Sequence, residues 1–227
     1  KRDMEASARL TNDFCDITCR SVMLLCLSPD YIAGKMMIVR ALLSGADLLV
    51  VTPSSLPLTA IDEPIDFAAM VPAQVVESLK STMQKSRLSR ITSLIIGGAP
   101  LSPGTEVELE KLPVDMYATY GMTETVSHVA LRRIGDSLSL YCALGGISFS
   151  IDERNCLIIH APHFSVKEFV TNDVVELVDS RNFRWIGRYD HVINTGGIKV
   201  FPELIEKKIA GLFTRRFFVT SCDDLKW

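Results

Sequence analysis

The sequence predicts an α/β fold in which helices cover a parallel sheet, followed by a smaller β-rich part. Apolar runs at 22–27 and 47–51 flank a helical pattern at 31–43, and strands that are apolar on both faces are typical of a parallel sheet between layers of helices. From about residue 126 onward, short alternating runs and turns replace that pattern. With 227 residues and 48% hydrophobic content, the chain can bury one sizeable core.

The first half of the chain is expected to alternate helices and strands. Residues 3–16 carry apolar side chains near helical spacing with no Gly or Pro, which predicts a helix. The helix at 31–43 is expected to end at Gly45. A strand at 67–71 leads into a helix with Pro72 in its first turn.

A glycine pair follows the strand expected at 94–96. The segment reads Gly97, Gly98, Ala99 and Pro100, and a short helix at 102–110 follows it. Ligands bind beyond the carboxyl ends of strands in open α/β sheets, so this turn is a candidate ligand site. A tight turn without a ligand would have the same composition, and the pattern alone leaves both interpretations open.

The second half is expected to hold short strands separated by turns. These strands are expected at 129–134, 146–151, 156–160, 174–178 and 183–186. A glycine turn at 195–197 then separates two short strands, Pro202 starts a helix over 203–212, and 217–219 is expected to be one more strand.

Charge and cysteine content argue against several classes of partner and metal site. The net charge is −3 and no block of Lys and Arg stands out, so neither nucleic acid nor an anionic membrane surface is expected as the main partner. No apolar run reaches membrane-spanning length. The six cysteines form no Cys-x-x-Cys pair, and His160 and His163 lack further ligands spaced for zinc. We expect a reduced, cytoplasmic protein.

A predicted strand leads into Tyr120 and Gly121, which begin a candidate catalytic motif at residues 120–124. Gly121 can adopt a positive φ and bring backbone close to a ligand. Met122 follows, and then Thr123, which can donate to a phosphate oxygen, and Glu124, which can hold Mg²⁺. The pairing indicates nucleotide chemistry, although five positions alone are also typical of a plain surface turn.

A second motif downstream settles the interpretation. It begins at Gly187 and Arg188 and extends to Glu206. The two motifs, in this order and at about this separation, resemble the adenylate-forming enzymes, which comprise acyl- and aryl-CoA ligases, adenylation domains and luciferase. Within that superfamily, residues 120–127 most resemble the o-succinylbenzoate–CoA ligases of menaquinone biosynthesis.

The resemblance implies a domain organisation. Residues 1–187 correspond to the C-terminal portion of the large domain, with an α/β part at 1–125 and a β-rich subdomain at 126–187. Residues 188–227 correspond to the hinge and the beginning of a small C-terminal α+β lid. Relatives carry a phosphate loop before the helix at 3–16 and a Lys near the C-terminus, for which Lys226 lacks the Gly-Lys context. We therefore expect this chain to be an interior portion of a larger enzyme.

The resemblance also assigns roles to residues. The implied adenine-lining turn is Gly97, Gly98, Ala99 and Pro100, and the implied remainder of the nucleotide site is Tyr120, Gly121, Met122, Thr123, Asp173 and Arg188. Asp173 is the expected ligand of the ribose hydroxyls, and it precedes Arg188 by fifteen positions as in the family. Thr123 and Glu124 are the expected catalytic residues, with Glu124 also binding the metal. Asn172 replaces the usual Gly, a mild departure because Asn tolerates the left-handed region.

The remaining implied sites are for the acyl group and coenzyme A. The acyl pocket is expected between the turn at 97–100, Gly121 and Tyr31, with its mouth near Ser127 and His128. Tyr31 stands where relatives have His, so the substituent contacted there is open. Asp190 falls at the hinge, and the loop with Gly196 and Gly197 is expected to approach coenzyme A.

The implied reaction joins a small-molecule carboxylate to coenzyme A, with ATP and Mg²⁺ as the other reactants. Another acyl- or aryl-CoA ligase, an adenylation module that loads a carrier protein, and a non-catalytic nucleotide-binding relative remain as alternatives. A thiol-acceptor assay with coenzyme A distinguishes the carrier-protein module.

Overall fold

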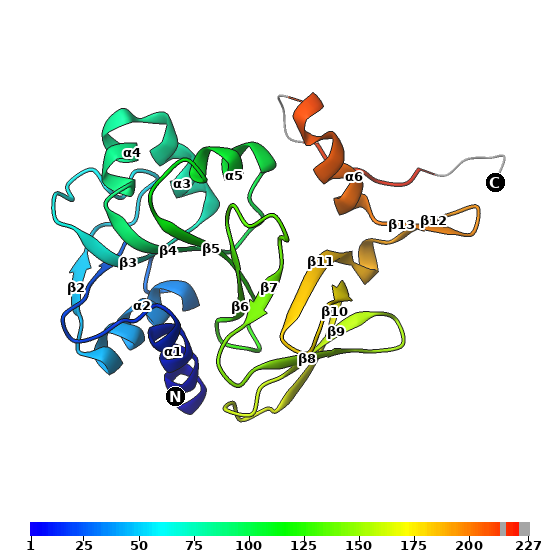
Figure 1. Ribbon diagram of the computed structural model, residues 1–227, viewed down its shortest axis with the longest axis horizontal. Helices are drawn as coiled ribbons and strands as arrows, with labels where there is room; N and C mark the ends of the chain where they lie inside the picture. Colours follow the sequence, from blue (N-terminus) through cyan, green and yellow to red (C-terminus); the bar gives the residue numbers. More distant parts are fainter. Residues whose placement is uncertain (214–216, 223–227) are drawn as a thin grey trace.

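The computed structural model describes residues 1–213 and 217–222. Its main feature is one sheet of eleven strands in the order β2-β1-β3-β4-β5-β6-β7-β11-β10-β9-β8. Figure 1 shows helices on both sides of the first half of this sheet and the C-terminal segment beside its second half. The predicted fold class is confirmed: a parallel sheet covered by helices, a smaller β-rich part and a small C-terminal α+β segment.

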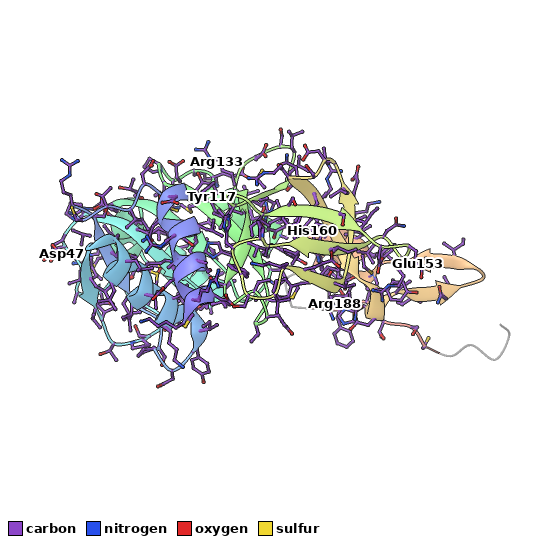
Figure 2. The ribbon with its side chains drawn as sticks, turned by 90° about the horizontal axis from the view of Figure 1, so that it is seen from below. Asp47, Tyr117, Arg133, Glu153, His160 and Arg188 are labelled. Carbon is purple, nitrogen blue, oxygen red and sulfur yellow. The ribbon has the colours of Figure 1, made fainter. Side chains whose placement is uncertain are left out.

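The first five strands of the chain are parallel and form one half of the sheet. They are β1 (Val22–Leu25), β2 (Asp47–Val50), β3 (Ile65–Met70), β4 (Ile91–Ile96) and β5 (Asp115–Gly121). Figure 2 shows Asp47, on the edge strand β2, at the end of the molecule far from Arg188.

Five helices cover both faces of this half. They are α1 (Arg2–Phe14), α2 (Ile32–Ser44), α3 (Pro72–Lys80), α4 (Thr82–Leu88) and α5 (Pro103–Leu109). Helices α1 and α2 lie on one face, and α3, α4 and α5 lie on the other (Figure 1). Neighbouring residues of one strand enter different cores: Met23 joins the core under α1 and α2, and Leu24 joins the core under the other three helices. Burial on both faces explains why β1 is apolar throughout and why β3 and β4 end in buried apolar runs.

The other six strands of the large sheet are antiparallel to their neighbours. They are β6 (His128–Arg133), β7 (Tyr141–Ala143), β8 (Ser148–Ile151), β9 (Cys156–His160), β10 (Glu168–Leu177) and β11 (Asn182–Arg188). Because β6 pairs with β5, the two halves form one continuous sheet. The change from parallel to antiparallel pairing falls beside the motif at 120–124.

The C-terminal segment follows β11. It contains η1 (Tyr189–His191), β12 (Ile193–Thr195), β13 (Ile198–Val200), α6 (Pro202–Ile209) and η2 (Ala210–Leu212). The two short strands around the glycine turn are confirmed. The helix predicted over 203–212 is shorter, since one turn of 3₁₀ helix replaces its last residues.

Two further expectations concern the end of the chain. The strand predicted at 217–219 is wrong: these residues form no strand, and the backbone N–H of Val219 donates to the Glu206 carboxylate at 2.7 Å. Lys226 lies outside the described residues. None of the helices in the described part has the length and hydropathy that a membrane crossing requires.

Candidate nucleotide-binding site

The glycine turn after β4 packs against β5. A Cβ atom at Gly97 would overlap Oγ1 of Thr119 on β5, and Gly98 has a φ of +88°. Position 97 therefore requires the absence of a side chain, and position 98 requires the left-handed backbone that glycine adopts without strain. Both glycines bring bare backbone to the carboxyl end of the parallel strands, where ligands of open α/β sheets bind.

The loop after β5 is wound around one buried threonine. The hydroxyl of Thr125 accepts from the N–H of Met122 at 3.0 Å and donates to the carbonyl of Ser127 at 2.8 Å. Val126 has a φ of +66°, a strained conformation for a β-branched residue. Gly121 lies so close to Ser127 that a Cβ atom would overlap its carbonyl. These contacts fix the loop in one conformation.

The tight loop presents the two expected catalytic side chains to solvent. Thr123 and Glu124 are both exposed, and the described residues supply no hydrogen-bond or ion-pair partner for either side chain. Their oxygens therefore remain free for a ligand. Backbone strain in a short loop with exposed, unpaired polar groups is typical of functional sites.

Asp173 lies at the centre of the site, although it comes from the β-rich half. The residue is only 8% exposed. Its Oδ2 accepts from the Tyr120 hydroxyl at 2.6 Å, and its Oδ1 accepts from the indole N–H of Trp185 at 3.1 Å. Burial, together with the neighbouring Asp173 carboxylate, raises the pKa of Tyr120 far above its usual range, so its hydroxyl remains a donor. The structure thus brings together Tyr120 and Asp173, which are 53 positions apart.

Arg188 lies between two carboxylates. In register it is paired with Asp173 across β10 and β11, and its guanidinium is 3.9 Å from Oδ1 of Asp173. The same guanidinium donates to both oxygens of Asp190, at 3.0 and 3.1 Å. The hydrogen bonds from Arg188 are the main cause that lowers the pKa of Asp190. Figure 2 shows Arg188 at the border between the β-rich strands and the C-terminal segment.

Glu203 fastens α6 to this border. Its Oε1 accepts from the N–H of Arg188 at 3.4 Å and lies 2.8 Å from Nδ1 of His191. A Cβ atom at Gly187 would come within 2.6 Å of the other carboxylate oxygen, so glycine makes room for it. In contrast, Gly196 and Gly197 occupy the tip of the β12–β13 hairpin, which projects away from the large sheet (Figure 1). A Cβ atom placed at either hairpin glycine would have no described atom within 4 Å apart from its chain neighbours.

The residues expected around the acyl group lie in two different environments. Tyr31 is 74% exposed at the beginning of α2. The ring of His128 is buried between the hydroxyls of Thr11 at 3.1 Å and Ser127 at 3.2 Å, and its place near the mouth of the acyl pocket stays a prediction. Burial is the main cause that holds the pKa of His128 well below its usual range, and nearby Arg40 lowers it further.

Arg40 is one of the residues at this site that the sequence prediction missed. It is 1% exposed, and its guanidinium donates to the Ser127 hydroxyl at 3.0 Å. Its Nε–H has no partner, and within the described residues no carboxylate lies within ion-pair distance. The available signal was a basic residue in the otherwise apolar stretch at 36–43. A buried, unpaired guanidinium is costly and is typical of an anion-binding function.

Comparisons with known proteins place the chain in an enzyme family. A family model described as AMP-binding enzyme matches residues 3–147. A probable 2-succinylbenzoate–CoA ligase of Mycobacterium tuberculosis is 26% identical over 203 residues, covering 81% of this chain and 52% of that relative. The chain thus spans about half the length of the curated relatives it matches.

Solved structures share the fold. An AMP-forming acyl-CoA synthetase/AMP-acid ligase II-like protein from Dyadobacter fermentans is 37% identical, with a TM-score of 0.80 over 93% of this chain and 61% of that chain. An o-succinylbenzoate coenzyme A synthetase from Bacillus subtilis, in complex with ATP and magnesium, has a TM-score of 0.81 at 15% identity and covers 98% of this chain and 53% of that chain. At 15% identity the second likeness concerns the fold alone.

Proposed function

The chain belongs to the family of AMP-binding enzymes, and from this premise we propose that it forms part of an ATP-dependent acid–CoA ligase. In the proposed reaction a substrate carboxylate attacks the α-phosphate of ATP and releases pyrophosphate. The thiol of coenzyme A then attacks the acyl-adenylate and releases AMP. The ligase name of the Mycobacterium tuberculosis relative supports this proposal.

The nucleotide would be held by the groups that the sheet brings together. The Gly97–Gly98 backbone would face the adenine. The buried Asp173 carboxylate would accept from the ribose hydroxyls, because a carboxylate offers about four lone-pair positions and its two protein donors occupy only two. Arg188 would add a guanidinium beside the same ribose or its phosphate.

Glu124 would suit Mg²⁺ as its single protein ligand. Mg²⁺ in phosphate chemistry is commonly held by one or two carboxylates, with phosphate and water oxygens completing its shell. The described residues contain no cluster of three metal-binding side chains, and the exposed Glu124 carboxylate supplies the single protein ligand that this arrangement requires. The ion would neutralise charge on the phosphates, and the Thr123 hydroxyl would donate to an oxygen of the phosphate under attack.

The choice of substrate depends on Arg40. Its guanidinium is buried under α2 with an unpartnered Nε–H, and it contacts Ser127, the residue that follows the catalytic loop. An acid with one carboxylate would deliver that group to the phosphate and leave Arg40 unpaired. An acid with a second carboxylate could fill both positions, and o-succinylbenzoate is such an acid. The ligase name of the Mycobacterium tuberculosis relative supports the same choice.

The test is pyrophosphate release by the full-length chain. We expect o-succinylbenzoate to be turned over with a kcat/KM well above that of benzoate or octanoate, and removal of the second carboxylate to eliminate most of the activity. A higher kcat/KM with octanoate would contradict the substrate while leaving the ligase proposal intact. Formation of an acyl-CoA product distinguishes a coenzyme A ligase from a module that loads a carrier protein, and absence of pyrophosphate release with every acid would refute the catalytic proposal.

A further inference from the structure

The carboxylate of Asp173 is held by two neutral donors, one on each oxygen. The Tyr120 hydroxyl donates to Oδ2 and the Trp185 indole N–H donates to Oδ1. The backbone N–H of Asp173 donates to the hydroxyl of Thr171 at 3.0 Å, which fixes the start of the side chain. The plane of the carboxylate is therefore set before any ligand arrives.

A β-bulge places Trp185 on the same face of the sheet as Asp173. In the antiparallel pair of β10 and β11, Asp173 faces Arg188 and Val174 faces Gly187, but Val175 faces Trp185. Ile186 is thus the extra residue of β11. Because side chains alternate between faces, a regular ladder would place Trp185 opposite Glu176, on the face away from Asp173.

The bulge therefore re-aims one side chain toward the site, which is a known role of bulges beside functional residues. Residues 173 and 175 share a face because they are two positions apart, and Trp185 joins that face through its pairing with Val175. The indole also packs against the core that contains Tyr120 and Phe183. Packing holds the ring, and the ring in turn directs its N–H at Oδ1.

We propose that Trp185 is a positioning residue for nucleotide binding: its indole N–H fixes the Asp173 carboxylate in the orientation that accepts the two ribose hydroxyls. This inference rests on the proposed nucleotide function of the site. Each oxygen of Asp173 has one lone-pair position taken by a protein donor and one left for a hydroxyl. Without the indole donor, Oδ1 loses the contact that sets its direction, and the carboxylate can rotate toward Arg188, whose guanidinium is 3.9 Å away.

The test is calorimetric titration of the full-length chain with AMP and with 2′,3′-dideoxy-AMP. Trp185→Phe keeps an aromatic ring in the core but removes the N–H. We expect its affinity for AMP to fall about tenfold, near the lower end for a hydrogen bond to a charged group, while its affinity for dideoxy-AMP equals that of the unchanged chain. In an Asp173→Ala background, Trp185→Phe should cause no further loss, because the two changes act on one interaction.

Tyr141→Phe is the matched control. Tyr141 stacks on Phe183 in the same aromatic group, with ring centroids 5.4 Å apart, and makes no hydrogen bond to Asp173. Removing its hydroxyl should leave the AMP affinity unchanged.

Three results would overturn the inference. An equal loss of affinity for both nucleotides in Trp185→Phe would show a purely structural role, and an unchanged AMP affinity would show no role at all. If the unchanged chain bound AMP no more tightly than dideoxy-AMP, Asp173 would not be a ribose ligand, and the proposed nucleotide site would fail together with the inference.

Discussion

Replacement of Arg40 by Met tests two effects of the buried guanidinium separately: its cost to the free energy of unfolding and its proposed binding of a substrate carboxylate. Burial lowers the pKa of Arg40 to about 10, whereas a free guanidinium titrates at about 12.5 or above. At about 1.4 kcal/mol for each pKa unit, the buried charge costs roughly 3 kcal/mol. Because the pKa of this base is lower in the folded chain, the cost is fully present below pH 10 and disappears only as the pH rises toward the unfolded value.

Arg40→Met should therefore stabilise the protein at pH 7. The variant removes the roughly 3 kcal/mol cost and loses the hydrogen bond to Ser127, which contributes about 1 kcal/mol. The net gain is about 2 kcal/mol. At about 2–4 °C for each kcal/mol in a domain of this size, the melting temperature should rise by roughly 4–8 °C.

The ligand response should change in the opposite direction. In the unchanged protein, o-succinylbenzoate at about a hundred times its Kd should add about 2.7 kcal/mol by mass action. Arg40→Met should show little of this gain and little pyrophosphate release with the same acid. The assay is thermal unfolding with and without o-succinylbenzoate, followed by a kinetic measurement on both proteins.

Arg132 offers a matched control, because its side chain is only 11% exposed but has a partner. It donates to both oxygens of Glu106, at 2.6 and 3.2 Å. Arg132→Met leaves that carboxylate unpaired and should lower the melting temperature. The reasoning is refuted if Arg40→Met lowers the melting temperature as Arg132→Met does, or if o-succinylbenzoate stabilises Arg40→Met as much as the unchanged protein.

Two other predictions concern the nucleotide side of the site. Asp173→Ala should weaken AMP and ATP binding by a few kcal/mol, since charge-assisted bonds to the ribose hydroxyls contribute about 1.5–3 kcal/mol each; calorimetry that shows unaltered affinity would contradict the ribose role. Gly97→Ala should destabilise the protein by about 1–3 kcal/mol because its Cβ overlaps the Thr119 hydroxyl. Adding Thr119→Ala should recover most of that loss in a denaturation experiment, and an unaffected Gly97→Ala single variant would show that the turn relaxes.

The parallel half of the fold followed from the sequence because burial on two faces leaves a strong signal. Strands β1 to β4 each contain a run of at least three apolar residues, α2 ends at Gly45, and α3 begins at Pro72. The pairing of the later strands had no such signal, since alternation shows that a strand has a buried face but not which strand it joins. The three residues of β7 are too few for any period, and α4 begins at a Ser81 cap only two residues after Leu79.

The strand expected at 217–219 was wrong because composition does not supply a pairing partner. Phe217, Phe218 and Val219 favour extended backbone. In the structure Phe218 is exposed, and the N–H of Val219 is bound to a side chain instead of another strand.

In the candidate site, too, some residues could be predicted from the sequence and others could not. Motifs placed Tyr120, Asp173 and Arg188 together, and the structure brings them into contact. Arg40 and Trp185 could not be identified in this way. The relation of Arg40 to Ser127 depends on how α2 packs, and that of Trp185 to Asp173 depends on a single bulged residue, which leaves no mark in a local sequence pattern.

The double engagement of Arg188 has a thermodynamic consequence. One guanidinium is bound to Asp190 in the turn at 189–191 and lies 3.9 Å from Asp173 in the site. A ligand that draws Arg188 toward Asp173 weakens its hold on Asp190, and a rotation of the turn that removes Asp190 frees Arg188 for the ligand. Linkage requires these two effects to have the same magnitude. In the proposed site, nucleotide binding at Asp173 and the orientation of the C-terminal segment would therefore favour one another by a single factor, so that each could be measured through the other.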